Sequence, residues 1–368
     1  MKILICNLES LGTPNGVTSV IRMLMRQLPC LEALTSRNSF KTPLKERETN
    51  LKAKTLYNEI FWMKHACFTL MNRKIRESDL IHLNPFNFTE LILLFLAKIH
   101  RKKCIAVMHS NINFHCLTYV IGLEMARLII VFNLILFMAD RIVLLSRAHY
   151  ENYLKYSVSK KLFERKVLII PNAIDSNVIL DEKKQIERRL SCIFVGRFEE
   201  RKGIYDLLTV AEQLRDEGIE FLIIGYGHLQ NHEKYSNNNV NMIGCVPNED
   251  IFHYYDRCQI FFLPSYSEVF NISILEAMSR GLVLLTSDIP GTREIIKEGR
   301  NGYLFPPGDV AKIKDLFLYL KHNPREIEKI SRNNLADVKQ FSIEKQAKEY
   351  LNLYRNVLSH VQNGRSFT

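Results

Sequence analysis

The sequence predicts an α/β protein with two domains, each built on a parallel sheet that helices cover on both faces. The chain has 368 residues, which favours two hydrophobic cores over one. Short apolar runs alternate with amphipathic helical stretches along most of its length. The runs are apolar at nearly every position, as is typical of parallel strands that are buried on both faces.

In the first half, apolar runs that end in polar or turn residues are expected to be strands. They lie at residues 2–6, 79–84, 103–109, 140–146 and 166–172. After the first strand a helix is expected from Val17 to Leu28. Residues 41–56 are expected to form a surface loop because they are polar and charged.

Residues 116–139 form the most apolar stretch of the chain. Glu124 and Arg127 interrupt it, which leaves fewer uninterrupted apolar positions than the ~20 that a helix needs to span a bilayer. We therefore expect a buried or interfacial helix here and not a membrane span.

The second half repeats the alternation of strands and helices, which indicates a second Rossmann-like domain. Helices are expected over Ile204–Glu217 and Val310–His322. The domains are predicted to be 1–171 and 172–341, because the segment that starts at Pro171 begins with a turn signal and becomes a polar charge run. A last helix at about 342–360 is expected to pack back on the first domain. The expected strands are residues 191–196, 220–225, 240–244, 260–265 and 282–287.

Charge is unevenly distributed along the chain, whose net charge is +11. Residues 1–170 hold 25 Lys and Arg against 12 Asp and Glu, whereas residues 171–368 hold 25 against 27. A basic half suits an anionic membrane surface or a lipid-linked phosphate acceptor, and solvated surface charge is the simpler alternative. Nucleic-acid binding is disfavoured, because the sequence has no zinc-finger spacing, RRM-like motif or basic zipper.

The eight cysteines are scattered and form no Cys-x-x-Cys pair, so neither a zinc site nor a disulfide framework is indicated. A reduced, cytoplasmic setting is the simplest interpretation. The apolar run in MKILICNLES is too short for the core of a signal peptide.

Four charged residues follow strands of the second domain. Glu268 lies in a loop and Glu276 one to two turns into a helix that is expected to start near Ile272. Arg197 and Lys202 follow the strand at 191–196. Carboxylates can bind sugar hydroxyls and fixed cations can bind a diphosphate, and a helix N-terminus adds free backbone N–H groups. No Asp-x-Asp occurs, so no bridging metal is expected.

These motifs come in an order that resembles glycosyltransferase family 4. The strongest part runs through GRFEERKG, IIGYG, NVNMIGCV, FFLPSYSEVFNISILEAMSRGLVLL, PGTREII and NGYLFPPGD, and the first half contributes NGVTSVIRML, AVMHS, ADRIVLLS and VLIIPNAID. The resemblance implies the GT-B fold, in which two Rossmann-like domains have parallel sheets that face across a central cleft. It also implies sugar transfer that retains the anomeric configuration.

The resemblance implies roles for particular residues. Arg197 and Lys202 would neutralise the leaving diphosphate, Glu268 would hold the donor sugar, Glu276 would bind the ribose, and His109 would lie beside the donor sugar. The other implied donor-binding residues are Gly16, Gly225, Ile243, Phe270, Asn271 and Ile272.

The sequence departs from the usual family pattern at three positions, namely Val269, Asn271 and Ala173. These departures bear more on the pocket for the donor sugar than on the diphosphate site.

The implied function is a retaining transfer from a nucleotide-diphosphate sugar to a lipid-linked glycan, as in the synthesis of bacterial O-antigen or capsule. No cofactor or metal is expected, and the protein would be peripheral on the inner face of the cytoplasmic membrane. Two alternatives stay open at this point. One is an isomerase similar to nucleotide-sugar 2-epimerases, and the other is a non-catalytic protein that binds nucleotide sugars.

Overall fold

The computed structural model describes residues 1–7, 16–35, 72–84, 88–112, 120–182, 189–227 and 239–359. They form two compact units, the first of which holds residues 1–170 and the C-terminal residues from Ala347 on. The second unit runs from Pro171 to Gln346. The sequence had suggested a division after residue 171. The loop expected at 41–56 lies outside the described residues.

The first unit is built on a six-stranded parallel sheet with the order β2-β1-β3-β4-β5-β6. The five strands that the sequence predicted are present, and β2 was missed. As the outermost strand, β2 pairs on one side only and carries a polar residue, so it lacks the continuous apolar run of the others. The strands are β1 (Ile3–Asn7), β2 (Leu31–Thr35), β3 (Leu80–Leu83), β4 (Lys103–Val107), β5 (Arg141–Leu144) and β6 (Val167–Ile169).

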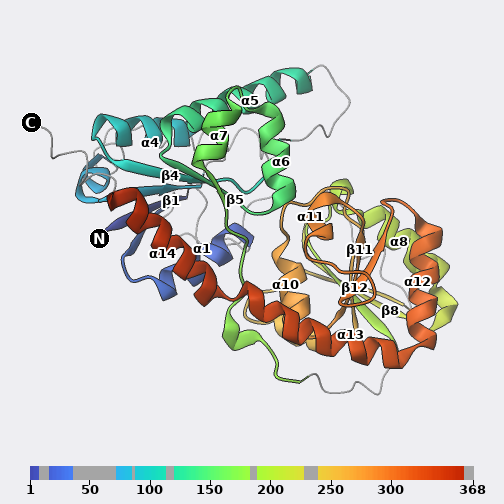
Figure 1. Ribbon diagram of the computed structural model, residues 1–368. Coiled ribbons are helices and arrows are strands. Elements are labelled where there is room, and N and C mark those ends of the chain that lie inside the picture. The colour runs from blue at the N-terminus through green and yellow to red at the C-terminus, as the bar shows by residue number, and fades with distance from the viewer. Residues whose placement is uncertain are drawn as a thin grey trace, which may run out of the picture. The chain divides into compact units, whose positions relative to one another are not determined.

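Helices cover both faces of this sheet: α4 and α5 lie over one face, and α1 and α14 lie over the other (Figure 1). None of the described helices combines the length and the apolar character that a bilayer span requires. The helices are α1 (Gly16–Gln27), α4 (Phe88–Ile99), α5 (Val120–Met138), α6 (Arg147–Tyr156), α7 (Lys160–Lys166) and α14 (Ile343–Ser359), which enters this unit at Ala347.

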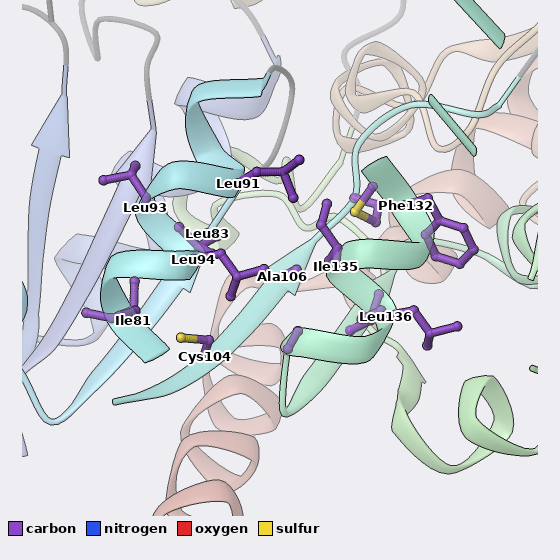
Figure 2. Close-up of a cluster of buried hydrophobic side chains, with 14 of the residues drawn as sticks. Ile81, Leu83, Leu91, Leu93, Leu94, Cys104, Ala106, Phe132, Ile135 and Leu136 are labelled. Carbon is purple, nitrogen blue, oxygen red and sulfur yellow. The ribbon is translucent and has the colours of Figure 1, made fainter. Parts of the chain in front are cut away.

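Alternation along β3 sends its side chains to opposite faces of the sheet. Ile81 and Leu83 are fully buried against α4 and α5, together with Leu94 and Phe132 (Figure 2). Each such side chain contributes about 1.5–3 kcal/mol when it leaves water. His82 alternates with these two residues and therefore points to the α1 and α14 face, as its contact with α14 shows.

The second unit is built on a six-stranded parallel sheet with the order β12-β11-β10-β7-β8-β9. From β7 the chain first adds strands on one side and then returns to add β10 on the other. The strand order therefore reverses between β7 and β10, and such a reversal is where open α/β sheets bind ligands. The strands are β7 (Ser191–Val195), β8 (Glu220–Ile224), β9 (Val240–Gly244), β10 (Ile260–Leu263), β11 (Val283–Ser287) and β12 (Gly302–Phe305).

The helices of the second unit follow the predicted pattern closely. The helix predicted over Val310–His322 has these bounds, whereas the one predicted over Ile204–Glu217 is α-helical only to Gln213 and closes with a 3₁₀ turn. Gly281 has φ +67° and follows the end of α10, as expected of a C-terminal glycine. The helices are α8 (Ile204–Gln213), α9 (Ile251–Asp256), α10 (Ile272–Ser279), α11 (Pro290–Arg293), α12 (Val310–His322) and α13 (Pro324–Asp337).

Candidate functional site

An ion pair joins two of the predicted site residues at the point where the strand order of the second unit reverses. Lys202 Nζ donates to Glu268 Oε1 over 2.6 Å. Lys202 follows β7 and Glu268 follows β10, and these two strands are neighbours in the sheet. Only 13% of the Lys202 side chain and 7% of the Glu268 side chain are exposed. A cation and a carboxylate that are largely shielded from water therefore stand together at the carboxyl edge of the sheet.

A glycine after Lys202 brings its loop onto the end of β10. Gly203 has φ +69°, and a Cβ on it would lie 2.0 Å from the carbonyl oxygen of Pro264. No other residue fits both this backbone conformation and this close approach. The glycine of the sequence motif EERKG therefore sets the position of Lys202.

The loop that carries Glu268 is held from two further sides. A Cβ on Gly291, in α11, would lie 2.2 Å from the Glu268 carbonyl oxygen, so the two backbones are in direct contact. Arg201 Nη1 donates to the carbonyl oxygen of Ser267 over 2.9 Å, and the Tyr266 N–H donates to the Arg201 carbonyl oxygen over 2.9 Å. The two loops are thus linked by backbone and side-chain bonds as well as by the ion pair.

Arg197, the second predicted cation, lies closer to solvent than Lys202. Its side chain is 54% exposed, and its Nη1 lies 3.0 Å from Glu199 Oε1. Arg201 Nη2 approaches the other oxygen of Glu199 at 3.7 Å. The structure therefore pairs Arg197 with Glu199 and Lys202 with Glu268, and Glu199 is a site neighbour that the sequence analysis did not single out.

Glu276, the second predicted carboxylate, lies in α10 and is held by a tyrosine. The Tyr255 hydroxyl, from α9, donates to Glu276 Oε2 over 2.9 Å. Burial raises the pKa of the Glu276 carboxyl, and the Tyr255 hydrogen bond opposes that rise. Tyr255 is itself fully buried. Tyr255 carried no signal in the sequence, because a tyrosine on the inner side of a short helix has the pattern of an ordinary core residue.

The first turn of α10 is fixed by a side-chain cap. Asn271 Oδ1 accepts the Ser273 N–H over 2.9 Å and the Ser273 hydroxyl over 2.7 Å. The carbonyl oxygen of Phe270 accepts from Asn172 Nδ2 over 3.0 Å, and the Phe270 ring packs edge-on against Phe341. The departure from the family pattern at Asn271 therefore supplies a helix N-cap. Ile272, the third predicted residue of this turn, begins the helix and is buried.

Gly225 and Ile243 lie at the ends of neighbouring strands, β8 and β9. A Cβ on Gly225, at φ +149°, would lie 1.7 Å from the carbonyl oxygen of Gly196, next to Arg197. The Gly225 N–H donates to the Gly244 carbonyl oxygen over 2.9 Å. The close approach at Gly225 is thus to the loop after β7. Ile243 is half-buried at the end of β9.

In the first unit, His109 follows β4 and is the end of a hydrogen-bonded chain. Its Nε2 donates to Asn84 Oδ1 over 2.9 Å. Burial, and then His82 and His149, lower the pKa of His109 to about 3, so the ring is neutral at pH 7 and Nδ1 is an acceptor. His82 Nδ1 bonds the Tyr354 hydroxyl of α14 over 2.8 Å. Asn84 and Tyr354 carried no signal in the sequence.

A second histidine holds the residue that follows His109. His149 Nδ1 accepts the Leu145 N–H over 3.2 Å, so its Nε2 carries the proton that is donated to the Ser110 carbonyl oxygen over 3.0 Å. Burial lowers the pKa of His149 to about 4. Gly16, the remaining predicted residue, is the first residue of α1.

The arrangement in the second unit can bind an anion and hydroxyl groups together. Lys202 offers a cation and Glu268 an acceptor, and the N-terminus of α10 adds a partial positive charge. Among the residues that the structure describes, no cluster of three or more His, Cys, Asp and Glu side chains is arranged to hold a metal ion.

Comparison with known proteins gives a consistent result. Residues 177–337 match the family "Glycosyl transferases group 1". The amylovoran biosynthesis glycosyltransferase AmsK of Erwinia amylovora is 29% identical over 156 residues, which are 39% of this chain and 38% of that protein. The N,N'-diacetylbacillosaminyl-diphospho-undecaprenol alpha-1,3-N-acetylgalactosaminyltransferase of Campylobacter jejuni is 26% identical over 48% of this chain and 47% of its own length. The chain therefore spans less than half the length of either relative.

A solved structure is similar over nearly the whole chain. It is Anabaena Alr3699/HepE in complex with UDP-glucose, with a TM-score of 0.73 and 17% identity over 96% of this chain and 99% of that one. At this identity the likeness shows the fold alone. It confirms the predicted α/β class and the GT-B fold.

Proposed function

We propose that this chain, whose residues 177–337 match the family of group 1 glycosyl transferases, transfers a sugar from a nucleotide-diphosphate sugar to an acceptor hydroxyl. The donor class is supported by the similar structure, which is a complex with UDP-glucose. The general activity, that of a glycosyltransferase, is supported by the family match and by relatives that are named as glycosyltransferases.

The observation that carries the proposal is the ion pair between Lys202 and Glu268 at the strand reversal. In the structure the two charges satisfy each other. A donor brings phosphate oxygens for the ammonium group of Lys202 and sugar hydroxyls for the carboxylate of Glu268, so both groups gain partners of the right kind. Arg197 adds a second cation, which is exposed enough to turn toward a diphosphate.

The proposed reaction breaks the bond between the anomeric carbon and the diphosphate oxygen and forms a bond from that carbon to the acceptor oxygen. The acceptor proton passes to the leaving diphosphate, so no separate base is needed. Attack from the face that the diphosphate leaves retains the anomeric configuration. Catalysis then depends on fixed cations that stabilise the developing charge, and on positioning.

The remaining site residues take supporting roles in this proposal. Glu276 binds the ribose hydroxyls, with its carboxylate held by Tyr255. The backbone N–H groups at the start of α10, from Phe270 to Ile272, meet sugar and phosphate oxygens. Neutral His109 accepts a hydrogen bond from a sugar hydroxyl through Nδ1. No metal or cofactor takes part.

The proposed acceptor is a lipid-linked glycan, in the assembly of a bacterial surface polysaccharide such as O-antigen or capsule. Two relatives support this choice, since one is named for amylovoran biosynthesis and the other for a diphospho-undecaprenol substrate. The excess of Lys and Arg in residues 1–170 fits a peripheral position on the inner face of the cytoplasmic membrane.

A thermal-shift screen with UDP-, GDP-, ADP- and dTDP-sugars, without added metal, tests the donor site. One nucleotide should raise the melting temperature by roughly 5–10 °C at about 100 times its Kd. Lys202→Ala should remove that shift, whereas Lys321→Ala, which breaks a surface pair with Glu217 in the same unit, should keep it. A protein that responds to none of these donors would contradict the proposal.

A further inference from the structure

The two units expose different kinds of hydrophobic side chain. In the described part of the second unit, the exposed large hydrophobic residues are all tyrosines, which carry a polar hydroxyl. The described part of the first unit instead exposes aliphatic and phenylalanine side chains. Apart from Met1, those among the described residues are Phe95, Ile99, Ile130, Leu134, Phe137, Val158, Leu168 and Ile169.

Five of these side chains belong to two adjacent helices. Phe95 and Ile99 are four residues apart in α4, and Ile130, Leu134 and Phe137 are spaced by four and three residues in α5, so each set follows one face of its helix. Each is between 43% and 60% exposed. We call these five residues the α4–α5 surface.

The α4–α5 surface is the outer side of a packed helix layer. The opposite faces of α4 and α5 contribute buried side chains such as Leu94, Phe132 and Ile135 (Figure 2), and the two helices lie side by side over the sheet (Figure 1). Their C-terminal ends are tied together, because Lys98 Nζ and Lys103 Nζ both bond Asp140, at 2.6 and 3.1 Å. The five apolar side chains therefore do not complete the core of this unit.

The sequence around this apolar surface is rich in cations. Residues 88–112 and 120–170, which include both helices, hold twelve Lys and Arg against five Asp and Glu. Arg101 comes two residues after Ile99, and Arg127 lies one helical turn before Ile130. Lys166 Nζ donates to the carbonyl oxygens of Leu136, Phe137 and Ala139, which keeps its charge at the C-terminal end of α5.

We propose that the α4–α5 surface docks the first unit on an anionic lipid bilayer. Its apolar side chains enter the boundary between headgroups and acyl chains, and the surrounding cations meet lipid phosphates, as in helices that lie in the membrane interface. A second copy of the chain fits less well, because a symmetric interface would oppose two rims of the same positive charge. Docking through this surface brings the chain to the membrane that holds a lipid-linked acceptor. Only this connection to the acceptor rests on the proposed function.

Co-sedimentation with vesicles tests this surface. The wild-type chain should bind vesicles of one part phosphatidylglycerol to two parts phosphatidylcholine, and it should bind phosphatidylcholine alone much less. Ile130→Ser/Leu134→Ser/Phe137→Ser should weaken binding at least tenfold, by roughly the transfer energy of the exposed parts of three apolar side chains. Tyr205→Ser/Tyr319→Ser, which removes exposed rings from the second unit, should bind as the wild type does.

Charge reversal provides a second, independent arm. Each cation near an anionic surface is worth roughly a fivefold change in binding, so Arg101→Glu/Arg127→Glu should lose roughly tenfold or more. Lys312→Glu/Lys345→Glu changes the net charge equally in the second unit and should have little effect. The proposal is overturned if either α4–α5 variant binds vesicles like the wild type. It is also overturned if the wild type binds no vesicles but self-associates, and the triple serine variant abolishes that self-association. The donor-induced thermal shift should persist in all four variants, which separates failure of docking from failure of the donor site.

Discussion

Replacing Lys202 by alanine separates the catalytic from the structural role of the ion pair. The substitution leaves the Glu268 carboxylate, which is 7% exposed, without its cation. Breaking a shielded pair by removing one partner costs about 3–5 kcal/mol, and we expect the low end, about 3 kcal/mol, because Lys202 keeps some contact with water. Chemical denaturation measures this loss in the free energy of unfolding.

The effect on turnover should exceed what the lost stability explains. A fixed donor aimed at developing charge is worth roughly 10²–10³ in kcat, so Lys202→Ala should lose about that factor under conditions where the protein is fully folded. Lys202→Ala/Glu268→Gln removes the unpaired carboxylate as well. It should regain most of the stability and none of the activity.

The matched control is Lys321→Ala, which breaks the pair with Glu217. That pair has similar geometry at 2.8 Å, but its side chains are 34% and 38% exposed. Because solvent screens this pair, its loss should change the free energy of unfolding little and leave turnover unchanged. The pair would be purely structural if Lys202→Ala turned over at the wild-type rate, or if the double variant recovered activity together with stability, and either result would contradict a catalytic role for Lys202.

Three other substitutions have defined expectations. Tyr255→Phe removes the hydroxyl that donates to Glu276, so we expect a loss of about 1–2 kcal/mol in donor binding, seen as a higher KM for the donor with kcat little changed. Gly291→Ala places a Cβ 2.2 Å from the Glu268 carbonyl oxygen and should weaken donor binding at least tenfold in titration calorimetry, because the loop must move. Burial lowers the pKa of His149 to about 4 in the folded state, against about 6.5 in the unfolded chain. The free energy of unfolding that depends on its neutral ring is therefore complete above pH 6.5 and falls by about 3 kcal/mol as the pH drops to 4. His149→Gln should flatten this pH dependence in urea melts. An unchanged KM, unchanged affinity or an equally steep pH profile would contradict the respective expectation.

The sequence predicted the central strands of both sheets and missed one outermost strand of each, β2 and β12. Central parallel strands are covered by helices on both faces and flanked by strands on both sides, so they read as continuous apolar runs. An outermost strand pairs on one side only. It needs no such run: Glu32 interrupts the apolar residues of LEALT, and GYLF stands between Asn301 and Pro306 in a stretch rich in turn residues.

The site residues were identifiable one by one, but their contacts were not. Motif order identified Lys202 and Glu268 as binding residues for different parts of a ligand, and nothing in the spacing says that they bond each other. That bond depends on backbone approaches at Gly203 and Gly291, which join segments far apart in the sequence. Tyr255 was missed because a buried hydroxyl on a core helix has no pattern of its own.

The most direct test of sugar transfer is the release of nucleoside diphosphate from the donor that the thermal screen selects, measured with and without a lipid-linked glycan fraction. We expect release that requires the glycan fraction, a labelled sugar that moves into it with its anomeric configuration retained, and loss of both in Lys202→Ala. Conversion of the donor without an acceptor would instead indicate an isomerase. Binding without any turnover, with the lipid-linked fraction present, would indicate a non-catalytic nucleotide-sugar-binding protein, and either result would contradict the account.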